Sequence, residues 1–178
     1  MARINIVLLL ALLLAFPARL QAEEPAIHQT MTVEEAYKAI PHNKTRFDPA
    51  SAKMSADEKA FLDTFFGLSD LAVAERVETQ TSKAQNDNYD AILTRLKSLD
   101  VPAKLKTAHR LVTEAVGEQR DYLASLKGGS AFDANAPLVE SSHEKLVQAY
   151  NELMQAYPAE NAHNKQAFFD HLCALDFK

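Results

Sequence analysis

Residues 55–75, SADEKAFLDTFFGLSDLAVAE, indicate the fold class more clearly than any other part of the chain. Ser55 and Glu58 form a capping box, the pairing of Ser or Thr with a Glu three residues later that marks a helix start. Apolar residues then recur at spacings of three and four, which places them on one helix face. This apolar stripe comprises Phe61, Phe65, Leu68 and Ala72. The pattern predicts a helix that begins at residue 55 and lies deep in a core.

Helical patterns continue on both sides of this stretch. Upstream, a capping box at residues 32–35 opens a short N-terminal helix that ends before Pro41, because the residue before proline disfavours the helical conformation. Downstream, the polar residues 79–88 predict a break or a turn. Three more helix starts are expected. Asp100 can cap one helix, with Pro102 in its first turn, Pro137 begins the next helix, and Asn161 begins the last helix.

No stretch alternates apolar and polar residues over the length of a strand. The predicted fold class is therefore all-α, an antiparallel bundle of four to five main helices preceded by a short N-terminal helix and an irregular lead-in segment. Helical spacing also predicts which side chains lie in the core. They are Phe61, Phe65, Leu105, Val112, Val116, Leu146, Tyr150 and Phe168.

The N-terminus has the features of a secretory signal peptide. Arg3 supplies a positive charge, residues 6–16 are uniformly apolar, and Ala22 offers a small residue for cleavage. The apolar run is too short to cross a bilayer, which takes about 20 residues. We therefore expect a signal peptide at 1–22, a flexible lead-in, short helix and basic connector at 23–54, and a helical bundle domain at 55–178. The protein is expected to be periplasmic or secreted, with no stable membrane anchor after cleavage.

Composition restricts the class of partner. The formal charge of the 178-residue chain is −5, and loss of Arg3 and Arg19 with the leader makes it −7. Nucleic-acid-binding proteins usually carry a strong basic excess, so this charge argues against a nucleic-acid partner. The single cysteine, Cys173, excludes a disulfide framework within one chain. Its apolar neighbours predict that the thiol is buried.

The sequence contains no enzyme signature. It has no G-x-S-x-G, P-loop, G-x-G-x-x-G or H-E-x-x-H motif, and no C-x-x-C-H motif for covalent haem attachment. Only four glycines are present, which leaves no loop suited to binding phosphate through backbone amides. The chain is therefore interpreted as a non-enzymatic binding or interaction protein with an unidentified ligand and no predicted cofactor.

A metal- or haem-binding bundle, for storage or electron transfer, is the alternative. Glu140 and His143 have the E-x-x-H spacing that puts a carboxylate and an imidazole on one helix face, and the antiparallel return of the last helix brings His171 toward the same end. Two imidazoles and a carboxylate suit zinc, copper or iron. In the competing interpretation, both histidines are partly buried and hydrogen-bonded to neighbours. A second E-x-x-H motif, at residues 160–163, lies about 25 Å away and cannot share the metal.

The irregular segment 41–54 is locally basic. His42, Lys44 and Arg46 are candidate partner-binding residues for a protein or a small anionic ligand, because loops on a rigid scaffold often carry binding. In the alternative interpretation this segment is a connector laid across the bundle, with Phe47 filling an apolar gap and Arg46 paired to a surface acid.

Overall fold

The computed structural model describes residues 45–78, 82–126 and 131–178. Within these ranges the chain forms five α-helices and a short 3-10 turn and contains no strand, so the all-α prediction is confirmed there. The predicted signal peptide, lead-in and short N-terminal helix lie outside the described residues. No helix in the described ranges is sufficiently long and apolar to cross a membrane.

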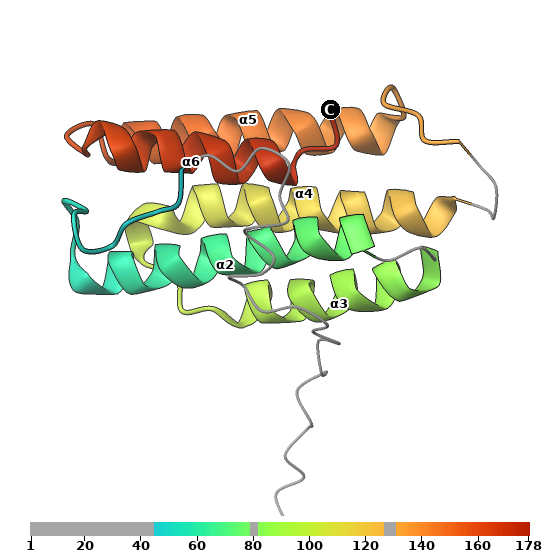
Figure 1. The fold of residues 1–178 in the computed structure, drawn as a ribbon, viewed down its shortest axis with the longest axis horizontal. Coiled ribbons are helices and arrows are strands. Elements are labelled where there is room, and N and C mark those ends of the chain that lie inside the picture. Colours follow the sequence, from blue (N-terminus) through green and yellow to red (C-terminus); the bar gives the residue numbers. More distant parts are fainter. Residues whose placement is uncertain (1–44, 79–81, 127–130) are drawn as a thin grey trace, which may run out of the picture.

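The helices are arranged side by side, and successive helices run in opposite directions (Figure 1). Helix α2 packs against α3 and α6, α4 packs against α3 and α5, and α5 also packs against α6. These contacts close a ring around a shared core. The helices are α2 (Ala56–Glu78), α3 (Ser82–Ser98), α4 (Lys106–Ser125), α5 (Pro137–Ala156) and α6 (Ala162–Leu175), with a 3-10 turn at Ala103–Leu105.

Three helices begin where the sequence predicts. At α2, the Ser55 N–H and hydroxyl both donate to Glu58 Oε2 at 2.9 Å, and the Glu58 N–H donates to Ser55 Oγ at 3.3 Å. Helix α5 has Pro137 at its first turn, where a missing N–H costs nothing. At α6, the Asn161 side chain accepts from the Asn164 N–H at 2.8 Å. Local capping chemistry therefore fixes these boundaries.

The predicted break at 79–88 is too long, because α3 already begins at Ser82. Asn88 and Tyr89 are buried in this helix, with 6% and 0% of their surfaces exposed. Burial of this part of α3 stabilises a helical turn that its polar sequence alone does not favour.

Asp100 does not cap the next helical segment, contrary to expectation. The chain enters the 3-10 turn at Pro102, which has no side-chain capping bond, and the Pro102 carbonyl accepts from the Leu105 N–H at 2.8 Å. The proline backbone thus begins the turn two residues after the predicted cap.

The core is formed by the apolar stripes of all five helices. The predicted core residues Phe61, Phe65, Leu105, Val112, Val116, Leu146 and Phe168 are buried. Tyr150 differs, because it is only partly buried and packs at the edge of the core. Its side chain lines a groove between α5 and α6.

Candidate functional site

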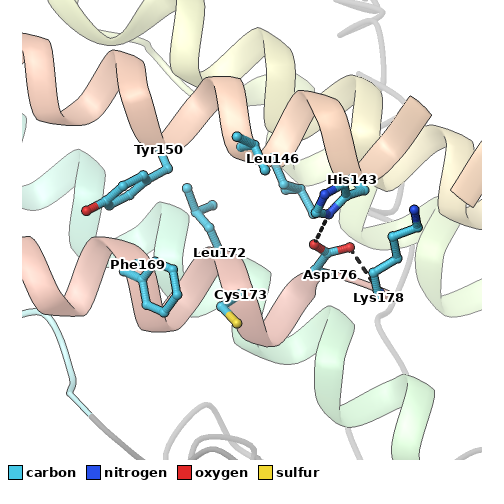
Figure 2. A pocket seen from close by; sticks show the side chains of 9 residues that line it. His143, Leu146, Tyr150, Phe169, Leu172, Cys173, Asp176 and Lys178 are labelled. Atoms are coloured by element: carbon cyan, nitrogen blue, oxygen red, sulfur yellow. Dashed lines mark hydrogen bonds and ion pairs between the residues drawn. The ribbon is translucent and has the colours of Figure 1, made fainter. Parts of the chain in front are cut away.

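A groove of about 340 Å³ lies between α5 and α6. Side chains from both helices line it and leave open space between them (Figure 2). Its apolar lining, which we call the walls of the α5/α6 groove, consists of Leu146, Val147, Tyr150, Phe169 and Leu172.

Two large apolar side chains in these walls are exposed. Val147 keeps 45% of its surface accessible and Phe169 keeps 42%. The Phe169 ring meets Tyr150 edge-on at 5.7 Å between centroids. Consecutive helical residues point about 100° apart, so burial of Phe168 in the core turns Phe169 outward. The exposure of Phe169 thus follows from helix geometry together with the open side of α6 that this position faces.

One end of the α5/α6 groove is polar. His143 Nδ1 lies 2.5 Å from Asp176 Oδ2 (Figure 2). The Lys178 backbone N–H donates to Asp176 Oδ1 at 3.1 Å, and the Lys178 ammonium lies 2.6 Å from Glu140 Oε1. The groove therefore combines apolar walls with a small set of hydrogen-bonded polar groups.

Cys173 also lines this groove and is partly exposed. The prediction that the thiol is buried is therefore wrong. Leu172 and Leu175 on the same helix are buried. Cys173 lies between the helical positions that face the core, and its side chain reaches the groove instead.

The structure brings together two of the three predicted metal ligands. Glu140 and His143 lie at the polar end of the α5/α6 groove, but each has a different partner there, Lys178 and Asp176. His171 lies elsewhere, in the contact between α6 and α2. In the described ranges 45–78, 82–126 and 131–178, no group of three or more His, Cys, Asp or Glu side chains could hold a metal ion.

His171 is buried and uses both ring nitrogens. Nδ1 lies 2.8 Å from Asp70 Oδ1, and Nε2 accepts from the Phe47 N–H at 3.3 Å. The ring stacks on Phe66 with centroids 4.5 Å apart. The sequence places His171 near the level of His143 along the bundle, but it does not specify which neighbour that face of α6 meets.

The segment 45–54, here called the strap, crosses α6 without regular secondary structure, as the sequence predicts for this part of 41–54. Phe47 fills an apolar gap, with its ring centroid 5.8 Å from that of Phe66.

Side chains of α6 and of Glu160 just before it accept hydrogen bonds from the backbone of the strap. The bonds are Thr45 N–H to Asp170 (2.8 Å), Phe47 N–H to His171 (3.3 Å), Asp48 N–H to Asn164 (2.9 Å) and Lys53 N–H to Glu160 (2.7 Å).

Of the predicted partner-binding residues, His42 and Lys44 lie outside the described residues. Arg46 is exposed on the strap, where it lines a second cavity of about 330 Å³ together with Asp63 of α2 and Arg95 of α3. This cavity carries charges of both signs, whereas the walls of the α5/α6 groove are apolar.

Sequence reasoning identified His143 but missed Val147 and Phe169. The available signal was the adjacent pair Phe168 and Phe169, because their side chains point about 100° apart and both can be buried only where a helix is covered on more than one side, as Phe65 and Phe66 are in α2. No family model matches the chain, and no curated protein or solved structure is significantly similar to it. Its function is therefore inferred from its own residues.

Proposed function

We propose that the chain is an exported, non-enzymatic protein that binds a small, largely apolar molecule in the α5/α6 groove. The observation that carries this proposal is the combination of a cavity of about 340 Å³, apolar walls and one polar end. Small-molecule sites commonly measure about 300–1,000 Å³ and are mostly apolar with a few convergent polar groups. In this proposal the helices act as an antiparallel bundle whose rigid core holds the two walls apart.

The position of the His143–Asp176 pair supports a binding role, because both side chains line the groove. Among the described residues, His143 is hydrogen-bonded to Asp176 and to no hydroxyl or thiol. The histidine is therefore placed to contact a ligand in the groove.

The leader at residues 1–22 supports export. Cleavage after Ala22 gives a mature chain that begins at Glu23. Intact-mass measurement of periplasmic or secreted material should find this species, and recovery of the full-length chain from the membrane would contradict export.

Titration with the neutral fluorescent probe N-phenyl-1-naphthylamine tests the groove. The mature protein should enhance its fluorescence saturably. The substitution Val147→Glu places a carboxylate in the wall and should weaken the probe's affinity at least roughly tenfold, because a charge in an apolar site must be desolvated. The matched control is Gln148→Glu, which adds the same charge at the next, exposed position of α5 and should bind like the wild type. Equal affinity of the wild type and V147E, or an absence of saturable binding, would refute the proposal.

A further inference from the structure

We infer that the α5/α6 groove selects an uncharged ligand with a hydroxyl group at one end, an apolar alcohol or phenol, and that His143 Nε2 accepts the hydrogen bond from this hydroxyl. This inference rests on the proposed function and adds the chemical class of the ligand to it.

The hydrogen-bond partner of His143 fixes which ring nitrogen is free to accept. A carboxylate only accepts hydrogen bonds, so Asp176 Oδ2 at 2.5 Å from Nδ1 requires the hydrogen to lie on Nδ1. In the neutral ring Nε2 then carries a lone pair and acts as an acceptor. Within the described part of the chain no protein group is hydrogen-bonded to Nε2. Nε2 is therefore available to accept a hydrogen bond from a ligand.

Asp176 is itself held in place, which keeps the imidazole in this form. Its Oδ1 accepts from the Lys178 backbone N–H at 3.1 Å, and its side chain is only 11% exposed. Both carboxylate oxygens thus accept hydrogen bonds from the protein itself, without a ligand. Metal-binding histidines are oriented by a carboxylate on the opposite ring nitrogen in the same way.

The charges at this end disfavour an anionic head group. Asp176 keeps its negative charge beside a neutral His143, and the Glu140 carboxylate is ion-paired with the Lys178 ammonium. A ligand carboxylate would therefore approach two acidic side chains and a lysine that is already ion-paired. Moving an ion out of water without a partner costs far more than moving a hydroxyl that forms a hydrogen bond.

The spacing along α5 sets the size of the apolar body. His143 and Tyr150 both line the groove and are seven residues apart, which corresponds to about 10 Å along a helix. Leu146 lies between them on α5, and Leu172 lies across from it on α6 (Figure 2). A fused two-ring aromatic body therefore suits this length, with its hydroxyl at the His143 end.

Three ligands of matched shape test this inference at pH 7.5, by competition against N-phenyl-1-naphthylamine on the mature protein. 2-Naphthol carries a donor, 2-methoxynaphthalene keeps the oxygen but lacks the donor, and 2-naphthoate is an anion. One hydrogen bond should make the Kd of 2-naphthol roughly threefold to tenfold lower than that of 2-methoxynaphthalene. Purely apolar binding would give no such preference.

The variant His143→Phe should bind both neutral ligands with nearly equal Kd, because it keeps an aromatic ring but has no acceptor. Asp176→Asn replaces a group that only accepts with an amide that can also donate to Nδ1, so the hydrogen can move to Nε2; the variant should show a reduced preference and still bind the probe. Glu144→Gln, an exposed neighbour on α5, should retain it.

Equal affinity of 2-naphthol and 2-methoxynaphthalene in the wild type, or tightest binding of 2-naphthoate, would overturn the hydroxyl assignment while leaving the groove as a binding site. Failure of the probe and of all three ligands to bind would overturn the proposed function together with this inference.

Discussion

His171 of α6 donates a hydrogen bond from Nδ1 to Oδ1 of Asp70 of α2 over 2.8 Å, and their side chains are only 3% and 2% exposed. The direction of this bond follows from the other ring nitrogen, because Nε2 accepts from the Phe47 N–H and therefore carries no hydrogen. One imidazole thus joins α2, α6 and the strap.

Removal of the Asp70 carboxylate should destabilise the fold strongly. Asp70→Ala leaves the buried Nδ1–H of His171 without its acceptor, so the free energy of unfolding should fall by about 3 kcal/mol in urea titrations. The matched control is Glu114→Ala, which breaks the exposed Arg110–Glu114 pair at 2.8 Å on α4 and should cost less than about 1 kcal/mol. A loss below about 1 kcal/mol for D70A would show that the buried pair does not hold α2 and α6 together.

Asn164 should control the accessibility of the strap. Its buried amide accepts from the Asp48 N–H at 2.9 Å and donates to the Asp48 carbonyl at 3.1 Å. Asn164→Ala removes both bonds, so limited trypsin digestion should cleave faster after Arg46 and Lys53. Asn151→Ala, at an exposed position of α5, provides a matched control and should keep the wild-type cleavage rate. Equal rates for both variants would contradict this anchoring role.

Two phenylalanine truncations should separate the core from the α5/α6 groove. Phe65 is 1% exposed in the core, and Phe65→Ala should cost about 3–5 kcal/mol of unfolding free energy. Phe169→Ala removes the same ring from a position that is 42% exposed and should cost much less, while weakening binding of N-phenyl-1-naphthylamine. Paired urea titrations and probe titrations measure both effects. A stability loss for F169A as large as that for F65A would place Phe169 in the core.

Tyr157 should make the protein sensitive to alkaline pH. Burial raises the pKa of the Tyr157 hydroxyl, and the nearby carboxylates of Glu58 and Glu160 raise it further. Above the ordinary tyrosine pKa of about 10, the unfolded chain loses this proton while the folded chain keeps it. Unfolding then releases a proton, so the stabilising contribution is complete below about pH 10 and is lost as the pH rises.

The variant Tyr157→Phe lacks this proton and should lose less stability than the wild type between pH 9 and 11 in thermal melts. At pH 7 its free energy of unfolding should lie within about 1.5 kcal/mol of that of the wild type, because the interaction of the Tyr157 hydroxyl with the Glu58 carboxylate contributes no more than a single hydrogen bond. Tyr150→Phe, at a partly exposed site, should follow the wild-type dependence. Parallel alkaline curves for Y157F and the wild type would contradict the assignment.

Local chemistry explains which helix boundaries the sequence predicts. The Ser55–Glu58 capping box, Pro137 and Asn161 act through neighbouring residues, and the three helices they open begin within one residue of these signals. The start of α3 is different, because its polar first turns are stabilised by the burial of Asn88 and Tyr89. That contribution comes from other helices and cannot be found by inspecting residues 79–88 alone.

In the candidate site, too, the features set by neighbouring residues could be predicted, and those set by the packing of other helices could not. Helix spacing correctly puts Glu140 and His143 at one end of α5, since they are three residues apart. The partner of His171 depends on how α6 is rotated between α2 and α5, and helical spacing does not specify this rotation. The groove itself arises from the separation of α5 and α6, which the packing of the whole core determines.

The hydrogen bonds made by the strap's backbone determine which substitutions this segment tolerates. Its backbone amides donate hydrogen bonds to the side chains of Asp170, His171, Asn164 and Glu160. Apart from the buried Phe47 and Ala52 and the partly buried Met54, which pack in or against the core, these hydrogen bonds place no requirement on the size or polarity of the side chains in the strap. Proline is the exception, since it has no N–H to give. A library of every amino acid at position 53 should be depleted of proline above all others.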